Sequence, residues 1–585
     1  MSVRLPPVAM RGTSAGLLAY ALCLFGCGRP DSTTSGPSVP AGRRTPSGPP
    51  PPVRLVDRAG ELGVRFQYEH GGTGKYYYLE MAGGGVALLD YDGDGWLDIY
   101  FPQGAPLPGS ASAPRANALF RNRGNGQGFE EVARRAGVTG DRNGKHVYCI
   151  GCAVGDYDND GFPDLFVTGY QGAFLYRNRG NGTFEDVTRK SGVADTRFGS
   201  SAAFLDYDAD GNLDLLVCEY LVYDLGKDVH CQNPAGEKDY CRPDFYRSGR
   251  SRLYHNEGAG RFRDVTDVAG LTSASNKALG VIAGDVDGDG DQDIYLACDM
   301  TPNLLYVNLG GGKFREEAVT RNCALSSLGN VYSGMGVDMQ DVDGDGNPEL
   351  WVTNYWDEAN NLYRNLGGGM FQDVATSVGL PPSNTAQVSF GTGLRDLNHD
   401  GWPDLFVTNG HVLEHPEGST PGASRKQTDQ LFLNQGAGSF RDGAPEGGPW
   451  FRTPHVGRGA AFGDLDNDGD LDVVISNNVG PNAVLMNEGT RYGHWVQFIL
   501  RGKQANRSGI GARLELTAGG RTQVAEVRSA HSYCSASDVR AHFGVGSARM
   551  VERVVVRWPG GRVDTVVGVP VDQLVTLTEG GDSVR

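Results

Sequence analysis

The stretch Asp90-Tyr-Asp-Gly-Asp-Gly-Trp-Leu-Asp98 decides the fold of this chain. Its carboxylates stand at positions 1, 3, 5 and 9 of a nine-residue loop, and Gly95 at position 6 permits a sharp bend. Side chains at positions 1, 3 and 5 of such a turn converge on one point, and the carbonyl of Trp96 at position 7 adds an oxygen. A hard cation that takes six to eight oxygens at about 2.3–2.6 Å fits this arrangement, so the loop predicts calcium rather than magnesium.

Six further copies of this loop follow along the chain, and we number all seven in chain order. An acidic surface turn is the alternative, but such a turn has no need of an acid at position 9 in every copy. We therefore expect about seven Ca²⁺ sites. The predicted ligands, with position 7 contributing its carbonyl, are Asp90, Asp92, Asp94, Trp96 and Asp98; Asp156, Asp158, Asp160, Phe162 and Asp164; Asp206, Asp208, Asp210, Asn212 and Asp214; Asp285, Asp287, Asp289, Asp291 and Asp293; Asp341, Asp343, Asp345, Asn347 and Glu349; Asp396, Asn398, Asp400, Trp402 and Asp404; and Asp464, Asp466, Asp468, Asp470 and Asp472.

An EF-hand is the obvious competing interpretation, and the sequence excludes it. That motif needs a bidentate Glu at position 12 and a helix on each side. Position 12 is apolar in every copy: Phe101, Val167, Val217, Leu296, Val352, Val407 and Ile475. The flanking residues are apolar and partly β-branched, which favours strands. The loops are therefore predicted to join the strands of β-hairpins.

The acidity of the chain has a specific source. Its formal net charge is −17 over 585 residues. Positions 1, 3, 5 and 9 of the seven loops hold 27 carboxylates, because only Asn398 replaces an acid there. Seven calcium ions would add +14 and leave a charge of about −3. The acidity thus indicates metal ligands, and no nucleic-acid partner is expected.

A second pattern follows each loop. It begins as Leu119-Phe-Arg-Asn122 and continues after a glycine turn with Phe129-Glu-Glu-Val132. Each unit is then strand, calcium loop, strand, strand, glycine turn and strand, which is typical of a β-propeller blade. The seventh copy lacks its last strand, whereas Val53–Gly60 resembles the end of a repeat. We expect this N-terminal segment to pair with the seventh blade and close the ring.

These repeats resemble the FG-GAP/VCBS type of integrin α-subunits, with small-residue stretches at Met81–Gly85 and Phe390–Gly393 before the acidic loops. Farther on, His494–Leu500, Ala541–Gly546 and Val554–Gly561 resemble the ASPIC/UnbV domain. The combination resembles the cartilage acidic protein family, in its bacterial lipoprotein form. The resemblance implies an all-β fold: a seven-bladed integrin-α-like β-propeller over residues 53–488 and a small β-sandwich-like domain over residues 490–580.

The N-terminal region indicates export. Residues 1–27 have positive charge followed by about eleven apolar residues, which is too short for a membrane span. They end in Leu24-Phe-Gly-Cys27, which resembles a lipobox and implies acylation of Cys27; ordinary signal cleavage or an uncleaved anchor are the alternatives. Residues 28–52 hold eight prolines and predict a disordered, semi-rigid linker. The expected location is a membrane-anchored lipoprotein facing the periplasm or cell surface.

Other motifs suggest chemistry that their context does not support. Cys231 and Cys241 flank a polar insertion and are the expected disulfide. Cys149-Ile-Gly-Cys152 has redox spacing, but its segment predicts a strand, not the helix N-terminus that lowers a thiol pKa. His411-Val-Leu-Glu-His415 matches a metalloprotease pattern, yet Gly410 and Pro416 make a helix improbable.

The leading hypothesis is therefore a non-enzymatic scaffold with structural calcium, outside the cytoplasm, that binds an unknown extracellular protein or carbohydrate. No catalytic residue or organic cofactor is predicted. A polysaccharide-active hydrolase or lyase on a propeller stays the alternative, and a lectin would use Trp356, Trp402 or Trp450. Loop six, with Asn398, is expected to be the weakest calcium site.

Overall fold

The computed structural model describes residues 53–193, 197–272, 276–381, 387–419, 421–489 and 493–581. The predicted signal peptide, Cys27 and the linker at 28–52 lie outside the described residues. In the described part of the chain, no helix has the length and apolar character needed to cross a membrane.

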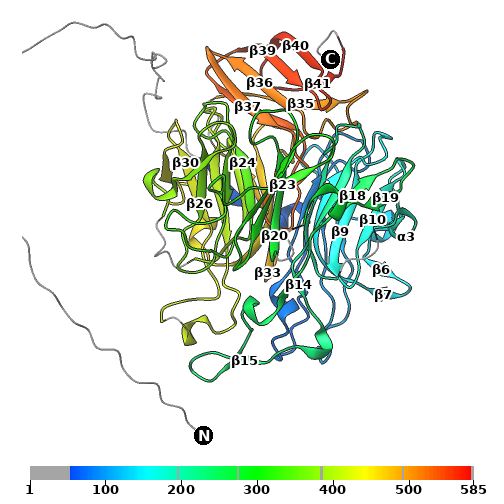
Figure 1. Ribbon diagram of the computed structural model, residues 1–585, viewed down its shortest axis with the longest axis vertical. Coiled ribbons are helices and arrows are strands. Elements are labelled where there is room, and N and C mark those ends of the chain that lie inside the picture. The colour runs from blue at the N-terminus through cyan, green and yellow to red at the C-terminus, as the bar shows by residue number, and fades with distance from the viewer. Residues whose placement is uncertain are drawn as a thin grey trace, which may run out of the picture. The chain divides into compact units, whose positions relative to one another are not determined.

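Seven four-stranded antiparallel sheets form the propeller blades (Figure 1). Blade one holds β2 (Ala87–Leu89), β3 (Asp98–Phe101), β4 (Ala118–Asn122) and β5 (Phe129–Glu131). Blades two to four are β8 (Tyr148–Gly155), β9 (Asp164–Tyr170), β10 (Phe174–Asn178) and β11 (Phe184–Asp186); β12 (Gly199–Leu205), β13 (Asp214–Glu219), β18 (Arg252–Asn256) and β19 (Phe262–Asp264); and β20 (Ala278–Gly284), β21 (Asp293–Cys298), β22 (Leu304–Asn308) and β23 (Phe314–Glu316). Blades five to seven are β24 (Val337–Gln340), β25 (Glu349–Val352), β26 (Asn361–Asn365) and β27 (Phe371–Asp373); β28 (Ser389–Arg395), β29 (Asp404–Asn409), β30 (Gln430–Asn434) and β31 (Phe440–Asp442); and β32 (Val456–Gly463), β33 (Asp472–Val479), β34 (Ala483–Asn487) and β1 (Leu55–Asp57).

Position 9 of every acidic loop is the first residue of a second strand, so the loops join the first two strands of each blade. The second strands are apolar and buried on both faces, because neighbouring blades cover them. Short helices follow several fourth strands, and glycines in the left-handed conformation end four of them. These helices are α1 (Ala59–Leu62), α2 (Ala133–Ala136), α3 (Thr188–Ser191) and α4 (Thr266–Ala269).

The ring closes through the N-terminal strand. Strand β1 pairs antiparallel with β34, with Leu55 opposite Asn487, and so supplies the fourth strand of blade seven. The first strands of neighbouring blades contact one another around the ring, and β32 contacts β2. The closure predicted from Val53–Gly60 is therefore confirmed.

The C-terminal region is a two-sheet sandwich. One sheet holds β38 (Ala541–Gly546), β35 (His494–Arg501) and β41 (Gln573–Thr578). The other holds β37 (Arg521–Glu526), β36 (Arg513–Ala518), β39 (Met550–Arg557) and β40 (Val563–Pro570). Their facing sides share one apolar core, in which Phe498 and Leu514 are buried. The sandwich that the sequence predicted is confirmed.

A segment of this domain fills the centre of the propeller. Residues 528–538, between β37 and β38, are buried and bond to the innermost strands of the blades. Ser532 exchanges two backbone hydrogen bonds with Val337 in blade five, and the Cys534 carbonyl accepts from Cys152 in blade two. Ala536 pairs with blade one in the same way. We call residues 528–538 the plug; nothing in the repeat pattern indicated it.

The structure places the predicted disulfide and the two motifs with redox or metalloprotease spacing. Cys231 and Cys241 form a disulfide in an insertion within blade three, beside β15 (Cys231–Gln232) and β16 (Lys238–Asp239). Cys149 and Cys152 lie on strand β8 as buried free thiols whose pKa values are raised by burial. Residues 411–415 form a loop, so their two histidines do not share a helix face.

Candidate metal centres

Each acidic loop is held by the same backbone hydrogen bonds. The position-6 amide donates to the position-1 carboxylate at 2.7–3.2 Å in all seven copies. The position-7 amide donates to position 5 at 2.8–3.1 Å. Glycine at position 6 has φ between 86° and 99°, a backbone conformation that other residues rarely adopt. Seven different sequences therefore form one loop shape.

The carboxylate at position 9 joins three parts of a blade. One oxygen accepts from the position-2 amide of its loop at 2.9–3.4 Å. The other accepts from the backbone amide of an asparagine that ends the third strand, at 2.7–3.3 Å. Loop, second strand and third strand are thus tied to a single buried acid, which explains why position 9 is acidic in every copy.

That asparagine also links the blades to one another. Its side-chain amide donates to the position-2 carbonyl of the preceding blade's loop at 2.7–2.9 Å. Asn122 reaches Leu465, so the series closes on itself from blade one to blade seven. The donors are Asn122, Asn178, Asn256, Asn308, Asn365, Asn434 and Asn487. In the sequence each asparagine is the last residue of the pattern that begins as Leu119-Phe-Arg-Asn122. Its presence in all seven copies was the sequence feature that could have indicated a structural role.

The donor set fits a hard cation. Carboxylates of three residues converge within 4.8 Å in each of loops one to four, for example Asp90, Asp92 and Asp94. Several of these carboxylates keep a buried oxygen without a hydrogen-bond partner: Asp92, Asp206, Asp208 and Asp287. A buried oxygen left unbonded is costly, whereas calcium takes such oxygens as ligands. The loops therefore fit Ca²⁺ by charge, by donor type and by unused oxygens.

The electrostatics point the same way. Burial, followed in most cases by repulsion from neighbouring acids, raises the pKa of every position-9 carboxyl. The pKa of Asp293 rises to about 8 and that of Glu349 to about 9. Without a cation, Asp293 and Glu349 therefore favour the protonated form at neutral pH. A divalent ion would favour the ionised form instead.

Side chains from the third strand differ between copies and place different charges beside the loops. Arg121 pairs with Asp92 and Asp94 of loop one, and Arg177 pairs in the same way in loop two. At the matching place in blade three, His255 Nδ1 lies 3.2 Å from Asp214 Oδ1. His255, Asp208 and Asp214 offer ligand atoms within 4.8 Å of one another, so His255 is an additional candidate metal ligand that the acidic pattern does not contain.

Loops five and six depart from the common geometry as they do in sequence. The longer side chain of Glu349 accepts from Asn365 at 3.3 Å, against 2.7–2.9 Å for the aspartates. In loop six the Asn398 side-chain nitrogen is buried without a partner. Loop six is also covered: Arg521 of the C-terminal domain lies 3.3 Å over the Trp402 ring.

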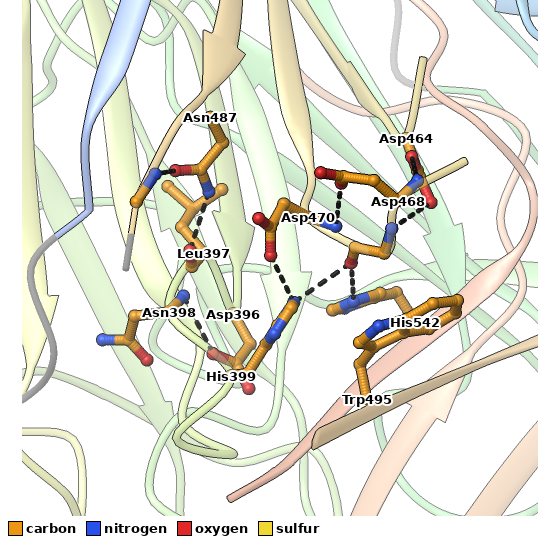
Figure 2. A network of polar contacts seen from close by, with 12 residues as sticks. Asp396, Leu397, Asn398, His399, Asp464, Asp468, Asp470, Asn487, Trp495 and His542 are labelled. Atoms are coloured by element: carbon orange, nitrogen blue, oxygen red, sulfur yellow. Dashed lines mark hydrogen bonds and ion pairs between the residues drawn. The ribbon is translucent and has the colours of Figure 1, made fainter. Parts of the chain in front are cut away.

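Loops six and seven meet the C-terminal domain at a pair of histidines (Figure 2). His399 of loop six and His542 of β38 each place Nε2 3.0 Å from the Gly469 carbonyl. Both histidines must therefore donate, which fixes the Nε2–H tautomer of each ring. Trp495 stacks beside His542 and lines the same contact. This contact joins two blades to the domain above them.

The C-terminal domain touches loops two to seven. Arg507 bonds to Asn159 in loop two, Arg513 donates to the Gly346 carbonyl in loop five, and Glu526 accepts from Asp285 in loop four. Loop one differs, because the hydrogen bonds and ion pairs described for it come from the propeller: Arg121 of its own blade, Asn178 of blade two and Asn467 of loop seven. The domain thus covers most, but not all, of the candidate metal centres.

The tryptophans that a lectin site was expected to use have different surroundings. Trp402 is buried under Arg521, and Trp450 is buried against His455 with its indole donating to Asp429. Neither is an exposed aromatic platform, so the expectation is wrong for these two. Trp356 is half-buried and lines a cavity.

Comparisons with known proteins agree with this architecture. The profile of FG-GAP-like repeats matches residues 90–167, 156–217, 241–296, 285–352, 341–407 and 396–475, and the profile named ASPIC and UnbV matches residues 502–584. Cartilage acidic protein 1 of Mus musculus is 24% identical over 513 residues, covering 82% of this chain and 71% of that protein. The Xenopus tropicalis protein of the same name is 24% identical over 508 residues, with the same coverage.

Among solved structures, an Agrocybe aegerita lectin that recognises non-reducing terminal N-acetylglucosamine aligns with 16% identity and a TM-score of 0.39, over 69% of this chain and 94% of that one. YCF48 bound to a D1 peptide aligns with 8% identity and a TM-score of 0.39, over 75% and 99%.

Proposed function

We propose, from the premise that this chain belongs to the family of FG-GAP-like repeat proteins with a C-terminal ASPIC and UnbV domain, that it is a calcium-stabilised binding scaffold outside the cytoplasm. One observation carries the proposal. Seven loops of the same shape each gather at least three carboxyl groups, and in loops one, three and four some of these carboxyl groups keep a buried oxygen without a hydrogen-bond partner.

Calcium would act here through structure rather than catalysis. The acids at positions 1, 3, 5 and 9 would hold the ion, and the ion would supply positive charge that offsets their mutual repulsion. Position 9 already connects loop, second strand and third strand through its hydrogen bonds. The asparagine beside it extends this connection to the preceding blade. Metal binding in one loop would thus stabilise two blades.

Counting bound metal tests this proposal directly. We expect about seven calcium ions per chain after dialysis against about 10 mM calcium, and far weaker retention of magnesium, which demands octahedral geometry. Elemental analysis of the full chain gives the count. A count of none or one, with thermal stability unchanged by chelation, would show that the loops are acidic turns and would end the proposal.

The proposed location is a membrane, with the protein facing the periplasm or the cell surface, anchored by acylation at Cys27. The support is the sequence of residues 1–27 and the proline-rich spacer that follows. Mass spectrometry of the peptide that begins at Cys27 should show the lipid mass, and Cys27→Ser should release the protein into the soluble fraction. An unmodified Cys27 peptide from the mature protein would contradict lipidation.

The partner is proposed to be an extracellular protein or a carbohydrate, with no role for nucleic acid. The alternative is a polysaccharide-active hydrolase or lyase, which would need two carboxylates beside a substrate cavity. Asp299 and Glu358 are the pair that most resembles this requirement, since both line one cavity. We expect no release of reducing ends or unsaturated products from a panel of polysaccharides; turnover that Glu358→Gln abolishes would favour the enzyme.

A further inference from the structure

A large cavity lies at the far ends of the second strands. The calcium loops lead into these strands, whereas the cavity residues follow their last residues: Tyr220 after β13, Asp299 after β21 and Tyr355 after β25. The cavity is therefore on the face of the propeller opposite the calcium loops. Its volume is about 790 Å³, within the range of sites that enclose small molecules.

Segments from distant parts of the chain build this cavity. The disulfide insertion contributes residues 230–243, whose strand β15 lies at the lower end of the molecule in Figure 1. The plug contributes Tyr533, which is buried against Phe390 with ring centroids 5.0 Å apart. None of these segments belongs to the repeated blade pattern. The cavity is thus a feature that this chain adds to its propeller.

Two carboxylates meet within the cavity. Glu358 accepts from the Ser333 amide at 2.7 Å and from the Tyr355 amide at 3.2 Å. Asp299 accepts from the hydroxyl of Tyr220, which in turn contacts the hydroxyl of Tyr78 at 2.6 Å. The Ser333 side chain contacts Glu358 at 3.4 Å and also bonds Asp299, so it brings the two acids together.

Positive charge near this pair is limited, because Arg242, which also lines the cavity, pairs with Asp244 at 3.1 Å. The contacts that favour ionised Glu358 come from neutral donors on Ser333 and Tyr355. The cation that acts on Asp299 is Lys277, whose ammonium itself donates to the Pro243 carbonyl at 2.9 Å. His411, in the opposite wall, stays neutral because burial lowers its pKa to about 3. With Asp239, three acids line the cavity against one arginine.

Aromatic side chains form much of the remaining wall. Tyr78, Tyr220, Tyr355, Trp356 and Phe390 all line the cavity. Aromatic faces attract ammonium groups, most strongly where water is excluded, and buried carboxylates need a counter-charge. A neutral sugar would satisfy hydroxyl contacts but would leave both acids without that charge. An ammonium on an apolar body satisfies the acids and the rings together.

We propose that this cavity binds a small organic cation, an ammonium group carried on an apolar body, with Glu358 and Asp299 as its counter-charges and the surrounding aromatic residues as its walls. This inference goes beyond the calcium scaffold and does not depend on it. Asp299, Glu358 and Ser333 lie outside all seven acidic loops.

Calorimetry on the calcium-equilibrated full chain tests this site with defined probes. Benzylamine and tetraethylammonium represent the proposed class, benzyl alcohol is the neutral analogue, benzoate the anionic one, and N-acetylglucosamine and glucose represent sugars. We expect the ammonium probes to bind at least about 10-fold more tightly than benzyl alcohol, because the charge is recognised. Glu358→Gln and Trp356→Ala should each weaken ammonium binding about 10-fold, and Glu257→Gln, an exposed acid of a blade-three turn, should not.

Proton release provides a readout that a structural role would not move. Burial raises the pKa of Glu358 to about 7 and that of Asp299 to about 6; the charged neighbours Lys277 and Asp244 and the hydroxyl of Tyr220 act on Asp299. A bound cation favours the ionised acids, so binding near pH 7 should release protons and affinity should rise from pH 6 to pH 8. Titrations in two buffers of different ionisation enthalpy measure the release.

Three outcomes would overturn the proposal. Equal affinity for benzylamine and benzyl alcohol would show that charge is not recognised. Binding of sugars alone would make the cavity a carbohydrate site. No binding of any ammonium probe at about 10 mM, with variants and parent equally folded by circular dichroism, would exclude the class; Asp299→Asn gives a second, conservative variant in case Glu358→Gln misfolds.

Discussion

Loops one and six have the same nine-residue pattern in opposite surroundings. In loop one the central residues, including Asp94, are exposed, and Arg121 pairs with the acids from one side. In loop six nearly every residue is buried, Asn398 replaces an acid, and Arg521 of another domain covers Trp402. One motif therefore gives two electrostatic environments. The comparison teaches that the electrostatic environment of such a loop depends on what is packed against it as well as on its own acids.

Removing all calcium is the test with the largest expected effect, and it decides whether either loop is a metal site. Extracellular sites with dissociation constants of about 0.1–1 mM, seven per chain, together stabilise by roughly 3–10 kcal/mol at about 1 mM calcium. Chelation should therefore lower the melting temperature by many degrees, and calcium but not magnesium should restore it. Differential scanning calorimetry measures this. An unchanged transition would remove the basis of the comparison.

Substitution at position 9 should separate the two loops. Asp98→Asn and Asp404→Asn each place an amide NH₂ group against a backbone donor, so each should cost about 1–3 kcal/mol in unfolding free energy. Only Asp98→Asn should also lose most of one bound calcium at about 1 mM free metal, since we expect loop six to be weak. Urea unfolding and metal analysis provide the two measurements. Loss of an ion from both variants, or from Asp404→Asn alone, would reverse the ranking.

Acid should affect the region beneath loop six before it affects loop one. His531 of the plug lies beside Arg395, which precedes loop six, and burial lowers the pKa of His531 to about 3. In the unfolded chain the pKa of His531 is about 6.5, so below that pH the unfolded chain binds a proton that the folded chain does not. The free energy of unfolding is therefore highest above pH 6.5 and falls as the pH drops. The loss at pH 5 is about 2 kcal/mol. Hydrogen exchange in chelator should show the plug opening ahead of blade one, and His531→Gln should flatten this dependence.

The smallest expected effect concerns Arg521. Its charge lies beside Asp396 and Asp400 and opposes a calcium ion in loop six. Arg521→Gln should raise the affinity of loop six about 5-fold, whereas Arg513→Gln should not, because Arg513 bonds to a backbone carbonyl of loop five and pairs with Glu515. Terbium bound in place of calcium can be excited through a nearby tryptophan, so its luminescence reports loops one and six, which have Trp96 and Trp402 at position 7. The part of the signal that Trp402→Phe removes belongs to loop six. An unchanged or lower loop-six affinity would show that Arg521 only packs.

The repeated parts of this molecule were predictable, and the unrepeated parts were not. Seven copies of one pattern indicated the blades, the loops and the pairing of Val53–Gly60 with the seventh blade. The plug, by contrast, is a single segment whose partners lie hundreds of residues away, as with Cys534 and Cys152. Asp299 and Glu358 lie in the connections between the second and third strands of blades four and five, which differ in length, so they do not share a position in the repeat. Only the fold brings both acids to Ser333. Repetition thus reveals the framework, while single contacts across the ring carry no sequence signal.

The closure of the ring also sets the order in which the protein can be assembled. Arg58 and Glu488, which meet beside the β1–β34 pair, are 430 positions apart in sequence. The hairpins around the acidic loops join residues close in sequence and should form quickly, whereas long-range closure comes late. Strand β1 has no partner until β34, which ends at Asn487, has been synthesised. Until then the edge of β1 stays open, and open strand edges favour aggregation. A chain that folds blade by blade therefore remains vulnerable until its first strand and its last blade have met.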